Sequence, residues 1–196
     1  EGLARLGTAG IVQGQDADGG LPTRNWTMGT FPEKDKGTEF VYADEWMDQP
    51  GTCYGCVQAC KRDVKKDITA PWPVEARYGG PEYETLGMMG PNCMVSDWNA
   101  ICKANELCNK YGLDTISCGA IVAWAMDCYE RGIIGLQQTG GLELCFGDGA
   151  VLVQLVEMIA RREGIGDILA DGTYESLSGT NVYWDFVELP SQMMEK

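Results

Sequence analysis

Apolar residues recur at helical spacing through the second half of the chain. The first such run follows Ser96, which we expect to cap a helix, and stops at Gly112, a residue type that commonly ends helices. Its apolar positions are Trp98, Ile101, Cys102 and Cys108. This pattern predicts an amphipathic helix with one buried face.

A second helix is predicted over residues 115–131, where apolar side chains occur on nearly every side. Asp114 can accept hydrogen bonds from the unpaired backbone amides of its first turn, and Gly132 can end it. Because this helix lacks a polar face, we expect it to be buried.

Further helices are predicted before and after this pair. Pro81 suits a first helical turn, and Glu84 would then lie near the positive end of the helix. Asp148 is expected to cap a later helix. The apolar face of that helix comprises Leu152, Leu155, Val156 and Ile159. A short last helix is expected from about residue 167 to residue 176.

Residues 1–50 lack this periodicity and are rich in Gly, Thr, Asp and Pro. We expect a loop-rich segment with a turn at residues 21–25, LPTRN. A cysteine cluster follows, and then a Pro-rich linker at 69–73 that cannot be helical throughout. The chain is therefore predicted to be mainly α, with an irregular helical domain over residues 51–180 that carries a C-x2-C-x3-C loop.

Composition narrows the class of protein. The chain has 196 residues, of which 44% are apolar and 22% charged, a balance that suits a globular domain. A net charge of −14 would repel nucleic-acid phosphates, and the apolar runs are too short to span a membrane. The chain has no histidine, which excludes His-based catalytic triads, His–Cys zinc sites and His-ligated haem within it.

Three of the nine cysteines are crowded together, as Cys53, Cys56 and Cys60. Thiols so close cannot all pair as disulfides, so we expect a reducing compartment with metal-bound or free thiols. The C-x2-C-x3-C spacing lets thiolates cover one face of a cubane iron–sulfur cluster while a fourth ligand comes from elsewhere.

Two other interpretations of these cysteines stay open. A zinc site would also need a fourth ligand, and zinc proteins usually present two separated pairs, whereas the nearest later thiol is Cys93. The three cysteines could instead be small buried hydrophobic residues. Lys61 and Arg62, which follow the cluster, would either offset its charge or form a solvated basic face.

The chain also resembles the aldehyde ferredoxin oxidoreductase family. The resemblance is carried by GGPEYETLG (79–87), GPNC (90–93), ANELCNKYGLDTIS (104–117), YERGII (129–134) and ARREGIGDILADG (160–172). The opening GTAG (7–10) and LPTRN (21–25) resemble segments just after that family's N-terminal pterin-binding sheet domain. The similarity extends to about Gly172, and residues 181–196 form a divergent tail.

This resemblance implies two cofactors, a [4Fe-4S] cluster and tungsten (or molybdenum) held by two pterins. Cys53, Cys56 and Cys60 look like three of the four cluster ligands, the fourth lying downstream of this chain.

Residues 109–114, NKYGLD, resemble the family's first pterin motif, D-x-x-G-L-D, which implies cofactor contact by Asn109, Gly112, Leu113 and Asp114. The leading Asp of the motif is Asn109 here, and an amide cannot accept hydrogen bonds on two carboxylate oxygens. Without the resemblance, Gly112 would only end one helix and Asp114 would only cap the next.

Glu84 matches the acidic residue proposed to lie beside the metal in this family. In a closed, poorly solvated pocket a carboxyl group has a raised pKa, and it could polarise a carbonyl or accept a proton from water. Glu82 competes for this role, and a plain helix-dipole contact would also explain Glu84. Cys118 is a candidate tungsten neighbour or, more simply, a core residue.

The activity implied by the resemblance is oxidation of a small aldehyde to a carboxylic acid, with electrons passed through the cluster to ferredoxin or an electron-transfer subunit. The chain would be an incomplete portion, inactive alone, that needs the remaining parts of the same enzyme. A homodimer and a cytoplasmic, anaerobic location are implied too. The alternatives are the tungsten subunit of an aromatic acyl-CoA reductase, a dimethyl-sulfoxide-reductase-type molybdopterin enzyme, a non-catalytic iron–sulfur module and a zinc-binding adaptor.

Overall fold

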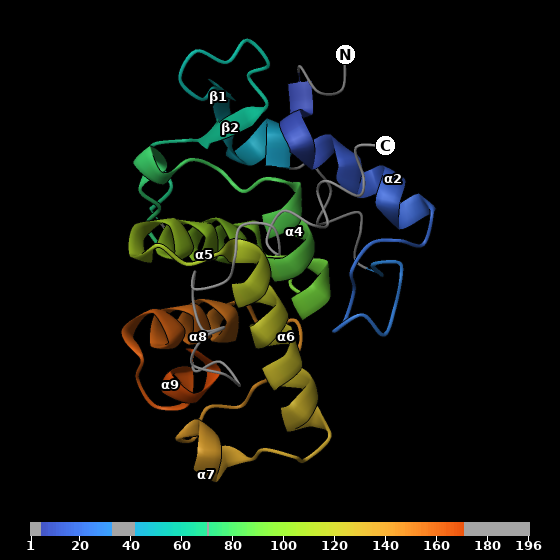
Figure 1. Cartoon of the computed structure of the whole chain (residues 1–196), viewed down its shortest axis with the longest axis vertical. Helices are drawn as coiled ribbons and strands as arrows, with labels where there is room; N and C mark the ends of the chain where they lie inside the picture. Colours follow the sequence, from blue (N-terminus) through green and yellow to red (C-terminus); the bar gives the residue numbers. More distant parts are fainter. Residues whose placement is uncertain (1–4, 33–41, 70, 171–196) are drawn as a thin grey trace, which may run out of the picture.

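Helices dominate the computed structural model, which describes residues 5–32, 42–69 and 71–170 (Figure 1). The α-helices are α2 (Val12–Ala17), α4 (Tyr83–Met89), α5 (Trp98–Tyr111), α6 (Thr115–Glu130), α7 (Leu136–Thr139), α8 (Gly149–Arg161) and α9 (Ile165–Ala170). The 3-10 and π helices are η1 (Gly7–Ile11), η2 (Tyr42–Trp46), η3 (Ala76–Tyr78) and η4 (Pro91–Cys93), and the strands are β1 (Met47–Gly51) and β2 (Lys61–Val64). The predicted mainly α fold is confirmed.

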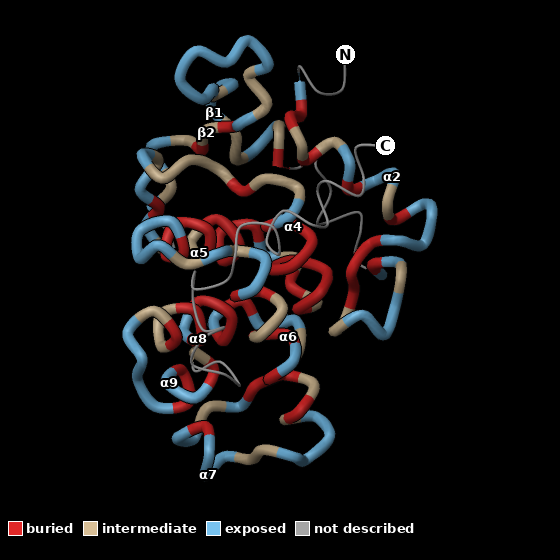
Figure 2. Tube along the Cα trace, in the orientation of Figure 1, coloured by how far each residue is buried: buried red, intermediate tan, exposed pale blue. Residues whose placement is uncertain are grey.

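The core lies between α4, α5, α6 and α8, where Figure 2 shows most of the buried backbone. The predicted face of α8 is buried at all four positions, Leu152, Leu155, Val156 and Ile159. Removing such apolar surface from water is worth roughly 25 cal/mol per Å². Figure 1 shows this core between the β1–β2 hairpin at one end of the molecule and α7 and α9 at the other.

The boundaries of α5 follow its capping chemistry. Asp97, rather than the predicted Ser96, caps the helix, because its Oδ1 accepts hydrogen bonds from the amides of Asn99 (2.9 Å) and Ala100 (3.3 Å). Gly112 ends it in the left-handed conformation, with φ of 71°, as predicted.

The start of α6 is also confirmed, since Asp114 Oδ2 accepts a hydrogen bond from the Ser117 amide at 2.7 Å. The expectation of burial on nearly every side is wrong, because Ile116 and Trp124 are 44% and 54% exposed. Only one side of α6 packs on α4, and Gly119 allows a close approach there: a Cβ at this position would lie 2.8 Å from the backbone of Met88.

Helix α4 starts two residues later than Pro81 suggested. The backbone of Glu82 is extended. The amide of Tyr83, the first residue of the helix, has no partner within the helix and donates to Thr8 Oγ1 at 3.1 Å. A long-range contact therefore sets this boundary. The last predicted helix is observed as α9, which begins at Ile165; residues 171–176 lie outside the described part of the chain.

The N-terminal region contains more helix than expected, because η1 and α2 form between residues 7 and 17. A turn forms in this region but lies at residues 24–27 rather than 21–25: Thr23 pairs with Met28, and the Thr27 amide donates to the carbonyl of Arg24 at 3.1 Å. The divergent tail, residues 181–196, lies outside the described residues. Among the helices that the structure describes, none has the length and apolar character needed to cross a membrane.

Candidate active site

A pocket of about 560 Å³ brings together segments that are distant in the sequence. Its lining comprises Lys61, Arg62, Asp63, Arg77, Tyr78, Gly79, Gly80, Glu82, Glu84, Thr85, Asn105, Asn109, Thr115 and Ile116. Two predicted site residues, Glu84 and Asn109, thus share one pocket, and β2 leads directly into it from the cysteine loop. The pocket is mostly polar at its lining positions and carries charges of both signs.

Glu84 lies in the first turn of α4 and is exposed to solvent. The closed environment expected around it is therefore not provided by the described residues of this chain. Its competitor Glu82 is half-buried, and its Oε2 accepts a hydrogen bond from Thr8 Oγ1 at 3.4 Å. Glu82 thus helps to tie α4 to the N-terminal segment. Both glutamates line the pocket, and the catalytic role of Glu84 stays a prediction.

Asn109 is held by hydrogen bonds along α5. Its Nδ2 donates to the backbone oxygen of Asn105 at 2.9 Å and to Asn105 Oδ1 at 3.2 Å. Asn105 Nδ2 in turn donates to the carbonyl of Gly79 at 3.3 Å. The two amides therefore connect the NKYGLD motif to the GGPEYETLG segment on one wall of the pocket.

The other motif residues shape the turn between α5 and α6. Gly112 supplies the left-handed backbone, Leu113 packs against the core, and Asp114 caps α6. None of these three lines the pocket within the described residues, although Thr115, the next residue, does. Their direct contact with a pterin stays a prediction.

The three clustered cysteines lie on the loop of the β1–β2 hairpin, where Gly51 pairs with Lys61. Cys53 and Cys56 are exposed and Cys60 is partly exposed, so their interpretation as buried hydrophobic residues is wrong. Within the described ranges no group of three or more acidic or thiol side chains is arranged around a metal position. Cluster binding by these thiols therefore stays a prediction.

Arg62 organises the end of this loop. Only 2% of the residue is exposed; its Nη1 donates to the carbonyls of Ala59 (2.9 Å) and Lys61 (2.6 Å), and its Nε donates to that of Arg5 (3.2 Å). The solvated basic face considered from the sequence is thus wrong for Arg62. Sequence reasoning missed this role because the spacing of the cysteines does not show where the Arg62 side chain turns, and the Arg5 carbonyl comes from a segment 57 residues away.

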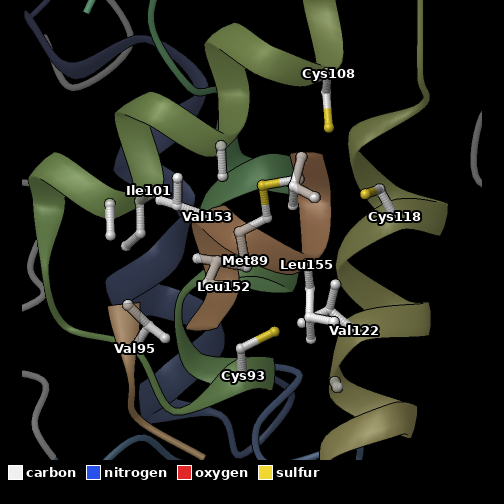
Figure 3. Close-up of a cluster of buried hydrophobic side chains, with 14 of the residues drawn as sticks. Met89, Cys93, Val95, Ile101, Cys108, Cys118, Val122, Leu152, Val153 and Leu155 are labelled. Atoms are coloured by element: carbon white, nitrogen blue, oxygen red, sulfur yellow. The ribbon is translucent and has the colours of Figure 1, made fainter. Parts of the chain in front are cut away.

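Cys118 is buried in the core and does not line the pocket. In Figure 3 its sulfur and that of Cys108 point toward one another from α6 and α5. The hydrogen bond with Cys118, together with burial, raises the pKa of Cys108 well above its usual range. This placement favours the core interpretation of Cys118.

Comparison with known proteins agrees with the motifs in this site. A family model described as "Aldehyde ferredoxin oxidoreductase, domains 2 & 3" matches residues 1–183. The tungsten-containing aldehyde ferredoxin oxidoreductase of Pyrococcus abyssi is 35% identical over 188 residues, which are 93% of this chain and 30% of the relative. That of Pyrococcus furiosus is 34% identical over 174 residues, 88% of this chain and 28% of the relative.

A further relative carries a different name. The "Aliphatic sulfonate oxidoreductase, WOR-like subunit" of Pyrococcus furiosus is 30% identical over 171 residues, which are 87% of this chain and 27% of that protein. The chain thus spans less than a third of the length of the curated relatives it matches. Its match to the family model over nearly the whole sequence shows that the chain belongs to the aldehyde ferredoxin oxidoreductase family, a family of tungsten oxidoreductases.

Proposed function

We propose that this chain forms part of a tungsten-pterin enzyme that oxidises aldehydes to carboxylic acids and passes the electrons through a [4Fe-4S] cluster to ferredoxin. The observation that carries the proposal is the shared pocket, in which Glu84 and Asn109 meet the strand that follows the cysteine loop. The remaining parts of the same enzyme would complete the site, and the chain alone would be inactive.

The lining of the pocket fits the polar edge of a pterin. The Asn105, Asn109 and Thr115 side chains offer both donors and acceptors, as a ring with amide-like edges requires. Lys61 and Arg77 supply positive charge suited to the phosphate that such a cofactor carries. When bound, the metal–pterin group would supply the two-electron chemistry, and the protein would orient the substrate.

Glu84 would accept the proton that the attacking water loses in this reaction. Oxidation of an aldehyde consumes one water and releases two protons and two electrons along with the acid. A carboxylate beside the carbonyl carbon can accept a proton from the attacking water, provided that closure of the whole enzyme excludes bulk solvent. The hydrogen bond between Thr85 and Thr115 holds the turn that carries Glu84 in place for this role.

Cys53, Cys56 and Cys60 would bind the cluster as thiolates, with the fourth ligand outside this chain. Their hairpin lies beside the pocket because β2, which begins at Lys61, also supplies pocket residues. Electrons could then leave the site singly over a short path. The exposure of Cys53 and Cys56 is consistent with a loop that another part of the enzyme covers.

Metal analysis of the whole enzyme, purified without oxygen, tests this proposal. We expect about four iron atoms and about one tungsten atom per chain, with oxidation of an aldehyde by a viologen dye. Cys56→Ser should lower the iron content and the activity, whereas Cys145→Ser, at an exposed cysteine outside the motif, should change neither. Iron without tungsten would support a non-catalytic electron-transfer module instead, and zinc alone would overturn the redox proposal.

A further inference from the structure

A second, smaller pocket of about 190 Å³ adjoins the first. The two share Glu84 and Ile116, but the small pocket is otherwise lined by apolar or uncharged groups, including Pro22, Trp26 and Met88. Glu84 is its one charged lining residue among those the structure describes. A chemical group bound in the small pocket would therefore be uncharged and apolar, and the part of the same ligand next to it would lie at the Glu84 carboxylate.

The backbone that presents Trp26 is conformationally strained. Arg24, Asn25 and Trp26 have φ values of 48°, 47° and 62°, a left-handed region that side chains other than glycine rarely adopt. Three such residues in succession persist only where surrounding contacts determine the conformation, and strain of this kind gathers at functional sites.

Contacts with η4 hold this turn. The amides of Arg24 and Asn25 donate to the carbonyls of Pro91 and Asn92, each at 3.0 Å, and the Trp26 amide donates to Asn92 Oδ1 at 3.1 Å. Asn92 is fully buried, so it provides a rigid base for the turn.

Contacts with α6 hold the same turn from another side. Arg24 forms an ion pair with Glu130 at 2.6 Å, and Asn25 Nδ2 donates to Asp127 Oδ2 at 3.2 Å. Trp26 nevertheless stays 63% exposed, although the turn that carries it is fixed on two sides. The strained turn is thus anchored while its largest apolar side chain stays accessible to a ligand.

We propose that Trp26 and Ile116 bind the apolar substituent of the aldehyde whose carbonyl lies at Glu84, so that aromatic or bulky apolar aldehydes are favoured over one- and two-carbon ones. This inference rests on the proposed function and names the substrate class of the same site. An indole ring offers a flat face for an aromatic substituent, and Ile116, 44% exposed, borders the junction with the larger pocket. An aldehyde as small as acetaldehyde reaches Glu84 without either contact.

The test compares benzaldehyde and acetaldehyde as substrates of the metal-loaded whole enzyme. In Trp26→Ala the kcat/KM for benzaldehyde should fall about tenfold or more while that for acetaldehyde stays the same. Trp26→Phe should keep most of the discrimination. Trp124→Ala is the matched control, because Trp124 is also an exposed tryptophan, at 54%, but lines neither pocket.

A binding measurement separates this inference from the proposed function. Benzamide, an unreactive aromatic amide, should bind the wild-type enzyme about tenfold more tightly than Trp26→Ala in a calorimetric titration. If aldehydes are oxidised but the benzaldehyde-to-acetaldehyde ratio and the benzamide affinity do not change, the role of Trp26 is overturned while the enzyme activity stands. If no aldehyde is oxidised but benzamide binding still depends on Trp26, the pocket stands and the proposed reaction fails. Equal losses for both aldehydes would mean a purely structural role and would overturn the inference.

Discussion

The hydroxyl groups of Thr85 and Thr115 lie 2.9 Å apart and form a hydrogen bond between α4 and α6. Thr85 follows Glu84 directly, and Thr115 follows the NKYGLD motif directly. Both hydroxyl-bearing residues line the larger pocket. One side-chain contact therefore holds the turn of the candidate catalytic carboxylate against the segment that ends the candidate pterin motif.

Thr85→Val should lower the free energy of unfolding by about 1–3 kcal/mol, because it leaves the Thr115 hydroxyl without this partner in a partly buried site. Urea unfolding followed by circular dichroism would measure the change. The double variant Thr85→Val with Thr115→Val removes both polar groups and should cost less than the sum of the two single changes. Simple additivity would contradict a direct interaction between the two hydroxyls.

Gly119→Ala should destabilise the packing of α4 on α6. The added methyl group would lie 2.8 Å from the Met88 backbone, so the helices must separate, at a cost of about 1–3 kcal/mol. Gly14→Ala in α2 is the control, because a Cβ there has open space around it, and this change should be neutral or stabilise by up to about 1 kcal/mol. Equal effects of the two substitutions in thermal unfolding would show that α4 and α6 are not packed this closely.

Because of the buried thiols, we expect the free energy of unfolding to fall as the pH rises into the alkaline range. Burial raises the pKa of Cys93 and of Cys102, and the Cys118 hydrogen bond with burial raises that of Cys108. Because the folded-state pKa values are raised, their stabilising effect is complete below the unfolded-state pKa of about 8.5 and is lost as the pH rises above it. Each thiol should then lower the free energy of unfolding by about 1.4 kcal/mol per pH unit.

Urea unfolding between about pH 8 and pH 11 measures this dependence. Cys108→Ala should reduce the slope of the free energy of unfolding against pH by the contribution of one thiol, about 1.4 kcal/mol per pH unit. Cys145→Ala, at an exposed cysteine, should keep the wild-type slope. A slope that Cys108→Ala leaves unchanged would show that this thiol ionises equally easily in the folded and unfolded chain.

Arg62→Met should reduce the iron content of the whole enzyme, because three carbonyl contacts that fix the end of the cysteine loop are lost. Arg62→Lys keeps the charge but not the forked donor geometry and should lose part of the iron. Arg161→Met is the control, since Arg161 is an exposed residue of α8 whose ion pair with Glu157 is worth little. Full iron content in Arg62→Met would rule out this organising role.

Features that depend on a few neighbouring residues could be predicted from the sequence. Gly112 ends α5 and Asp114 begins α6, because a left-handed glycine and a capping carboxylate act within one helical turn. The apolar face of α8 was predictable for the same reason, since helical periodicity is local. The family resemblance also rests on contiguous strings such as NKYGLD, and the match to the family model confirms it.

Features that depend on distant contacts could not be predicted in this way. The helix start at Tyr83 is set by Thr8, the burial of Arg62 by carbonyls that include that of Arg5, and the exposure of Trp124 by which side of α6 finds a partner. Short local patterns contain no information about these long-range contacts. The sequence alone was therefore enough to determine the helix caps and the apolar faces, because both depend on residues within a few positions of one another. The pocket that joins Glu84 to Asn109 and the strained turn beside it were decided by the tertiary structure, because both form only where distant segments pack against one another.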